Sequence, residues 1–221
     1  MDNNQHIQKV MEVETPVGDP AVIAARHQEA ARRYPDVNLD SDEYVVVSIK
    51  RHSFGVFGII ISSMLSFIIV ASIWITISIM PNNLNLTSAM KTNITLASLA
   101  LLALSVVSAM IGHSIYKNNK FIITNERVVQ WIVSGLFNQK KQTINLEAIE
   151  DISFSQTGFL QHLIGFGTVR LSTIGEESTY TFTFVPQPNK YAELLGDLVE
   201  NAKENQFITD EMMELGRKLS A

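Results

Sequence analysis

Two long apolar runs without a charged residue constrain this chain more than any other feature. They cover Phe54–Met80 and Ile94–Tyr116, and neither contains Asp, Glu, Lys or Arg. Each exceeds the roughly 20 residues that a helix needs to cross a bilayer core of about 30 Å. Two fully buried helices of this length would need more surrounding protein than 221 residues supply. The sequence therefore predicts a membrane protein with transmembrane helices at 54–80 and 94–116.

The charges beside the two runs predict the orientation. Only residues 81–93 separate the runs, so the helices form a hairpin with both ends on one side of the membrane. Basic residues collect on the cytoplasmic side, and the connecting loop holds only Lys91. We expect an inner-membrane protein with cytoplasmic termini and an extracytoplasmic loop at 81–93. The basic residues expected to face anionic lipid flank the other ends of the runs: Lys50, Arg51, Lys117 and Lys120.

Composition and motifs argue against several classes of function. The net charge of −5 speaks against general nucleic-acid binding. The absence of cysteine excludes thiolate catalysis and cysteine-ligated metals. The five histidines are scattered without metal-ligand spacing, and no G-x-S-x-G elbow appears. We therefore expect no catalytic residue, no metal site and no cofactor.

The segment before the first run predicts a helix, a linker and one strand. Residues 1–43 are mostly polar, and Asp19 followed by Pro20 is typical of a helix start. That helix should end near Tyr34, because Pro35 follows it. Within residues 44–53, Tyr44–Ile49 is rich in β-branched residues and predicts a strand that needs a partner. We expect the partner in the domain after the second run; the alternative leaves the strand free on the membrane surface.

Residues 117–205 predict a small antiparallel β-domain closed by a helix. Apolar and polar residues alternate along several short segments, as in half-buried strands. From Asn189 to Ala202 the apolar positions change to helical spacing. The tail 206–221 predicts a further short helix, whose Met212, Met213 and Leu215 either pack on the domain, which we favour, or meet a partner. The fold class is α+β: a transmembrane helical hairpin plus a small β-barrel or sandwich with a C-terminal capping helix. The predicted strands are Phe121–Thr124, Arg127–Ser134, Gln139–Asn145, Asp151–Gln156, Thr168–Thr173 and Thr179–Val185.

A resemblance to a known family rests on five segments in their order: Asn118–Val129, Gly135–Asn138, Ile149–Ile152, Gly158–Gln161 and Gly165–Val169. These segments resemble the bacterial PH-like (pleckstrin-homology-like) membrane domain family. The resemblance covers about residues 42 to 200 and includes the order of parts: a basic strand before the membrane, two spans, then the β-domain. It implies a PH-like fold of two packed antiparallel sheets with a capping helix, and it supplies no catalytic residue.

Two apolar loops and a few cations are the candidate contact residues. We expect Phe159, Leu160, Leu163, Ile164 and Phe166 to form a short helical loop that plugs the open side of the barrel. In the alternative this loop, or Leu136–Phe137 at a hairpin tip, dips into lipid or a partner groove. The remaining candidates for headgroup or partner contact lie on the first strands of the β-domain and between them: Arg127, Leu136, Phe137, Lys140 and Lys141.

A non-enzymatic interaction module anchored in a prokaryotic cell membrane fits these features best. Its partners would be the lipid bilayer and either another protein or further copies of the chain. Specific recognition of an anionic headgroup needs converging basic groups, whereas Asn125 and Glu126 occupy the first hairpin turn. A lipid-headgroup sensor is therefore the second hypothesis, and an accessory subunit of a transport or pore complex is the third.

Overall fold

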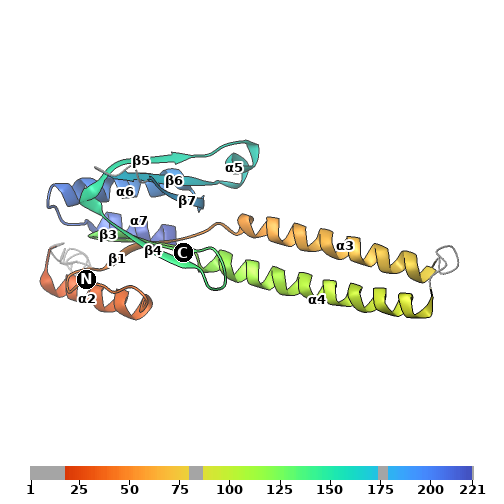
Figure 1. The fold of residues 1–221 in the computed structure, drawn as a ribbon. Helices are drawn as coiled ribbons and strands as arrows, with labels where there is room; N and C mark the ends of the chain where they lie inside the picture. Colours follow the sequence, from red (N-terminus) through yellow and green to blue (C-terminus); the bar gives the residue numbers. More distant parts are fainter. Residues whose placement is uncertain (1–17, 80–86, 174–178, 221) are drawn as a thin grey trace, which may run out of the picture.

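A β-rich domain lies at one end of two long helices in the computed structural model (Figure 1). The structure describes residues 18–79, 87–173 and 179–220. The segment before residue 18, residues 81–86 of the predicted loop at 81–93 and the predicted turn at 175–177 lie outside these residues. Both predicted spans, apart from Met80, and the whole set of predicted strands lie within them.

The two apolar runs form an antiparallel helical hairpin. A short 3-10 helix, η1 (Ser53–Val56), leads into α3 (Phe57–Ile79), and α4 (Ser88–Asn118) returns to the domain. Both are long and apolar enough to cross a membrane. Their large apolar side chains point outward rather than into a protein core, Phe67 and Leu104 among them. Outward-facing apolar side chains on both helices are typical of helices that lipid surrounds.

The second helix is longer than its apolar run. Helix α4 starts at Ser88 rather than Ile94, because the Thr87 hydroxyl accepts a hydrogen bond from the Met90 N–H at 3.3 Å and caps the first turn. It ends at Asn118, two residues beyond the predicted span. Hydroxyls inside the helices bond to their own backbone, as Ser63 does to the carbonyl of Ile59 at 2.9 Å.

In the described residues, seven strands form two antiparallel sheets. One sheet has the order β1-β2-β3-β4, and the other has the order β5-β6-β7. Every ladder is antiparallel. The residue pattern of each segment located these strands correctly to within about two residues at each end. The strands are β1 (Val45–Lys50), β2 (Lys120–Thr124), β3 (Arg127–Val133), β4 (Gln139–Asn145), β5 (Ile149–Ser155), β6 (Phe166–Thr173) and β7 (Thr179–Pro186).

The strand before the first span belongs to the domain after the second span. β1 pairs with β2, and Ile49 lies opposite Phe121 and Lys50 opposite Lys120. The prediction that this strand finds its partner beyond the helices is thereby confirmed. The helical hairpin is thus an insertion between two neighbouring strands of one sheet, which fixes the domain directly to the end of both helices.

The two sheets do not close into a barrel. Within the described residues β4 and β5 do not pair with each other. The 3-10 turn η2 (Leu146–Ala148) lies between them in the chain, and each strand is the edge of a different sheet. β1 approaches β7 beyond its end, where the His52 N–H donates to the carbonyl of Phe184 at 2.6 Å. The barrel alternative is therefore wrong, and two separate packed sheets are correct.

The core lies between the two sheets and under the C-terminal capping helix. Phe121 and Phe182 stack across the two sheets with ring centroids 4.9 Å apart. Helix α6 (Pro188–Lys203) buries its apolar stripe of Tyr191, Leu194, Leu195, Leu198 and Val199 on this core. Burial of that stripe gives the capping helix its stability, because most helical stability comes from packing of an amphipathic face.

Two further helices cover the four-stranded sheet. The tail helix α7 (Asp210–Ser220) crosses β1 so closely that a Cβ on Gly216 would lie 2.5 Å from the carbonyl oxygen of Val46. The prediction that its methionines pack on the domain is confirmed, since Met212 and Met213 contact the core cluster. Helix α2 (Pro20–Arg33) starts where expected, with the Asp19 carboxylate accepting from the Ala21 N–H at 2.9 Å.

The predicted plug of the barrel does not enter the core. The segment forms a short helix, α5 (Phe159–Ile164), but Phe159 is 77% exposed and Leu163 is 67% exposed. Leu160 is exposed as well, and only Phe166, after the left-handed Gly165, is buried. The plug prediction is wrong because α5 is the tip of the long β5–β6 hairpin and extends past the end of both sheets (Figure 1).

Candidate membrane-proximal site

A row of basic and aromatic residues crosses the sheet where the two helices join it. The strand registers place Lys50 opposite Lys120, Lys120 opposite Trp131, and Trp131 opposite Lys141. Directly opposed residues point to the same face of a sheet. All three lysines are exposed, and the Lys141 ammonium lies 4.7 Å from the Trp131 ring centroid. That distance fits a cation–π contact.

A cleft of about 760 Å³ opens on this face, next to the last turns of α4. Its floor includes Lys120 and Trp131, and its walls come from the connector 33–37 and from the β3–β4 tip. Lys120 forms an ion pair with Asp36 across the cleft, with 3.7 Å between Nζ and the carboxylate oxygen. The cleft therefore combines basic, acidic and aromatic groups, beside the predicted membrane boundary.

The β3–β4 tip carries the most exposed apolar residues of the sheet. The tip is closed by a hydrogen bond of 3.0 Å from the Ser134 N–H to the carbonyl of Asn138. Phe137 is 99% exposed and Leu136 is also exposed. The base of the tip is held against α4, because Asn119 hydrogen-bonds both the N–H and the carbonyl of Val133. The tip is thus a rigid projection beside the end of α4.

The base of the helical hairpin is closed by polar and aromatic contacts. The Tyr116 hydroxyl donates to the carbonyl of His52 at 2.6 Å, which joins α4 to the chain entering α3. Arg51 turns inward, with its guanidinium 5.6 Å from the Tyr116 ring centroid and 5.7 Å from that of Phe182. Burial lowers the pKa of Arg51, but a guanidinium stays charged at neutral pH. Unlike Lys50, Lys117 and Lys120, Arg51 does not face the surroundings.

The family model described as "Bacterial PH domain" matches residues 53–199, which include both apolar helices. The chain belongs to the bacterial PH domain family. One similar solved structure is a DUF1696 family protein with a pleckstrin-homology domain from Shewanella loihica. It is 13% identical, with a TM-score of 0.30, over 38% of this chain and 70% of that chain. The search among curated proteins found no match to this chain.

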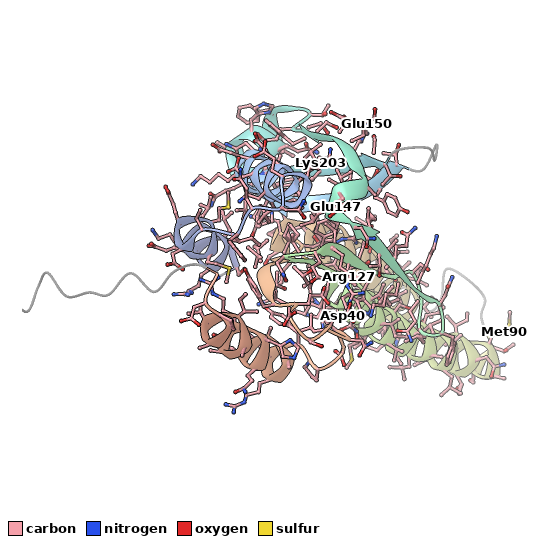
Figure 2. The ribbon with its side chains drawn as sticks, turned by 90° about the vertical axis from the view of Figure 1, so that its left-hand side faces the viewer. Asp40, Met90, Arg127, Glu147, Glu150 and Lys203 are labelled. Atoms are coloured by element: carbon pink, nitrogen blue, oxygen red, sulfur yellow. The ribbon has the colours of Figure 1, made fainter. Side chains whose placement is uncertain are left out.

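In this bacterial PH domain Arg127 is engaged in an internal ion pair. Its Nε and Nη2 donate to the two carboxylate oxygens of Glu43 at 2.8 and 2.5 Å. Nη2 also donates to the carbonyl of Asn38 at 2.6 Å and lies 3.6 Å from Asp40. Figure 2, viewed from the end opposite the helices, shows Asp40 and Arg127 close together. Arg127 therefore connects the N-terminal segment to the β2–β3 turn, far from Lys140 and Lys141.

Glu43 is the buried partner of that pair, with 0% of its side chain exposed. Burial would raise the pKa of this carboxyl, but hydrogen bonds from Arg127, Thr124 and the Asp40 N–H outweigh it and lower the pKa. The neighbouring Glu126 is exposed, yet partial burial of its carboxyl and the negative charges of Glu43 and Asp40 raise its pKa. The carboxylates of Asp40, Glu43 and Glu126 lie close enough for a metal ion, but Arg127 already supplies the positive charge there.

Sequence reasoning missed two groups of this bacterial PH domain. It assigned no role to Glu43, because its partner Arg127 is 84 residues away and no local pattern joins them. It also missed Trp131 and Arg33 at the cleft, although a tryptophan opposite lysines would have stood out once the strand register was known. The structure brings together Lys50, Lys120 and Lys141, and it places Lys117 three residues before Lys120, at the end of α4.

Proposed function

We propose that this bacterial PH domain protein is a membrane-anchored, non-enzymatic interaction module. Helices α3 and α4 cross a prokaryotic cell membrane, and the domain with both termini lies on the cytoplasmic side. There it contacts a protein partner or a second copy of the chain. A PH-like domain supports an interaction module in general, and the membrane anchor and the partner are our proposal.

The insertion of the helical hairpin between paired strands carries this proposal. Because Lys50 and Lys120 are neighbours across β1 and β2, the inner ends of both helices meet at one edge of the domain. The domain cannot move away from the membrane without breaking its own sheet. The bias of basic residues supports a cytoplasmic domain, since Lys91 is alone near the other end of the hairpin.

The outer edges of the two sheets offer a surface for a protein partner. In the described part of the chain β4 pairs only with β3, and β5 pairs only with β6. Free strand edges are templates for pairing with another chain, and Lys140 and Lys141 on β4 restrict which chains can approach. On β5, Phe154 is about half exposed, which adds an apolar contact at this edge.

Cysteine crosslinking of the full chain in native membranes tests this proposal. The sequence contains no cysteine, so Ser153→Cys on β5 provides a single reactive site at the proposed edge. We expect a crosslinked adduct with a partner or a second copy, and none from the control Glu193→Cys on the exposed side of α6. A chain that stays monomeric and uncrosslinked in both variants would refute the interaction module, and extraction of the chain by carbonate would refute the anchor.

An anionic lipid headgroup is the second candidate ligand, favoured by the row of Lys50, Lys120 and Lys141 beside the cleft. Each such charge near an anionic surface contributes about 1 kcal/mol. Vesicle binding should be measured with the full chain, since a fragment starting at residue 117 lacks β1. Retention of one anionic lipid that is lost on Lys140→Ala with Lys141→Ala, and not on Lys190→Ala with Lys203→Ala, would favour this function over a protein partner.

A further inference from the structure

Two apolar projections leave the domain at the end where the helices join it. The first is the β3–β4 tip with Leu136 and Phe137, and the second is α5 with Phe159, Leu160 and Leu163. Figure 1 shows both at the end of the domain that faces the helical hairpin, with the tip next to α4 and α5 on the side of α3. We call them the α4-side finger and the α3-side finger.

The α4-side finger lies at the depth of the last apolar turn of α4. Leu136 and Phe137 line the same cleft as Ser114 and Ile115, and these residues lie just before Lys117, the first charged residue after the span. A residue at this depth reaches the boundary between headgroups and acyl chains, where aromatic side chains are enriched.

The α3-side finger lies at the start of α3. Phe166, which follows α5, stacks on Phe54 with ring centroids 5.1 Å apart. Phe54 in turn stacks on Phe57, the first residue of α3, at 5.4 Å. Phe166 therefore joins the C-terminal end of α5 to the helix expected to enter the membrane.

Charges beside the α4-side finger and at the junction with the helices complement an anionic membrane surface. Lys140 and Lys141 follow the α4-side finger on β4, and Lys117 and Lys50 lie at the junction with the helices. A combination of inserted apolar side chains and flanking cations binds peripheral segments to anionic bilayers. An exposed apolar tip with no cationic flank would fit a protein groove equally well, whereas this arrangement fits lipid.

We propose that both fingers insert into the cytoplasmic leaflet on either side of the helical hairpin and fix the orientation of the domain against the bilayer. This inference rests on the proposed membrane anchor. The occupant is the lipid surface itself, so the sheet edges at β4 and β5 stay available to a protein partner. Two contacts on opposite sides of the hairpin prevent the domain from tilting about the end of the helices.

Spin-label accessibility in the full chain tests the proposal. Because the sequence has no cysteine, the variants Phe137→Cys and Leu163→Cys each carry one label, with Leu136→Cys and Phe159→Cys as second variants if either fails to fold. Glu150→Cys is the control on the same sheet as α5, at the opposite end of β5, and Leu104→Cys reports on the span. The protein is reconstituted in phosphatidylcholine vesicles with and without phosphatidylglycerol.

The collision rates with oxygen and with a water-soluble nickel chelate separate the outcomes. We expect the ratio of oxygen to nickel collisions at 137 and 163 to rise well above that at 150 and towards that at 104. A ratio at 137 and 163 equal to that at 150, with 104 in hydrocarbon, overturns the insertion and leaves the anchor intact. Labels shielded from both reagents and broadened by a neighbouring label mean that a second copy covers the fingers. A nickel-accessible label at 104 refutes the anchor itself.

Discussion

The hairpin turns at the two ends of the four-stranded sheet differ in polarity and in whether other residues cover them. At the end far from the helices, the β2–β3 turn is polar and the N-terminal segment covers it: Asn125 accepts from the Tyr44 N–H, and Arg127 pairs with buried Glu43. At the end near the helices, the β3–β4 tip leaves Phe137 almost fully exposed. A buried charge that is fully hydrogen-bonded stabilises the fold, whereas an exposed aromatic tip is available to bind something else.

The largest loss of stability is expected when the Glu43–Arg127 ion pair beside the β2–β3 turn is removed. Glu43→Ala leaves Arg127 and Thr124 without their carboxylate acceptor, so the free energy of unfolding should fall by about 3 kcal/mol. Chemical unfolding of the full chain in detergent measures this. The control Glu126→Ala removes the same charge at an exposed position of the same turn and should change stability by less than about 0.5 kcal/mol. Equal losses in both variants would contradict a special role for Glu43.

A smaller loss is expected where α7 crosses β1. In Gly216→Ala the new methyl group would meet the carbonyl of Val46, so α7 must shift and stability should fall by about 2 kcal/mol. Gly196→Ala in α6 is the matched control, because nothing lies within 4 Å of its Cβ position. It should gain up to about 1 kcal/mol through the higher helix propensity of alanine. Limited proteolysis of the tail and unfolding curves would both distinguish the two variants.

The loss of stability in acid that we expect at the β2–β3 end of the sheet depends on the lowered pKa of Glu43. Because the folded pKa of Glu43 lies below its unfolded value of about 4.3, its stabilising contribution is complete above that value. The contribution is lost as the pH falls through the folded pKa. Unfolding between pH 3 and pH 6 should therefore show an acid-side loss that Glu43→Gln reduces. An identical pH profile in the variant would show that Glu43 is not the titrating group.

The regular elements could be predicted from the sequence because their causes are local. Alternating residues in Thr168–Thr173 and the helical stripe of Tyr191, Leu194 and Leu198 correspond directly to β6 and α6. Pairing of β1 with a strand of the domain beyond the helices also followed, since a lone strand before a membrane span needs a partner. The family resemblance placed these elements in one fold, and the family match supports it.

The candidate site could not be predicted, because its residues come together only through the register of strands that are far apart in the sequence. Lys50 and Lys141 share one row only when four strands are aligned across the inserted helices. The exposure of Phe159 was missed for a different reason. A short apolar segment looks the same in sequence whether it packs in a core or projects towards lipid, and the difference depends on the length of the β5–β6 hairpin.

The smallest effect on stability is expected at the exposed β3–β4 tip. Phe137→Ala removes a large aromatic side chain, yet the free energy of unfolding in detergent should change by less than about 0.5 kcal/mol, because that side chain is 99% exposed and has little packing to lose. The Glu43→Ala variant at the opposite turn of β3 provides the comparison in the same assay. A loss at Phe137 as large as that at Glu43 would mean that the tip packs against the protein, and the contrast between the two ends of the sheet would disappear.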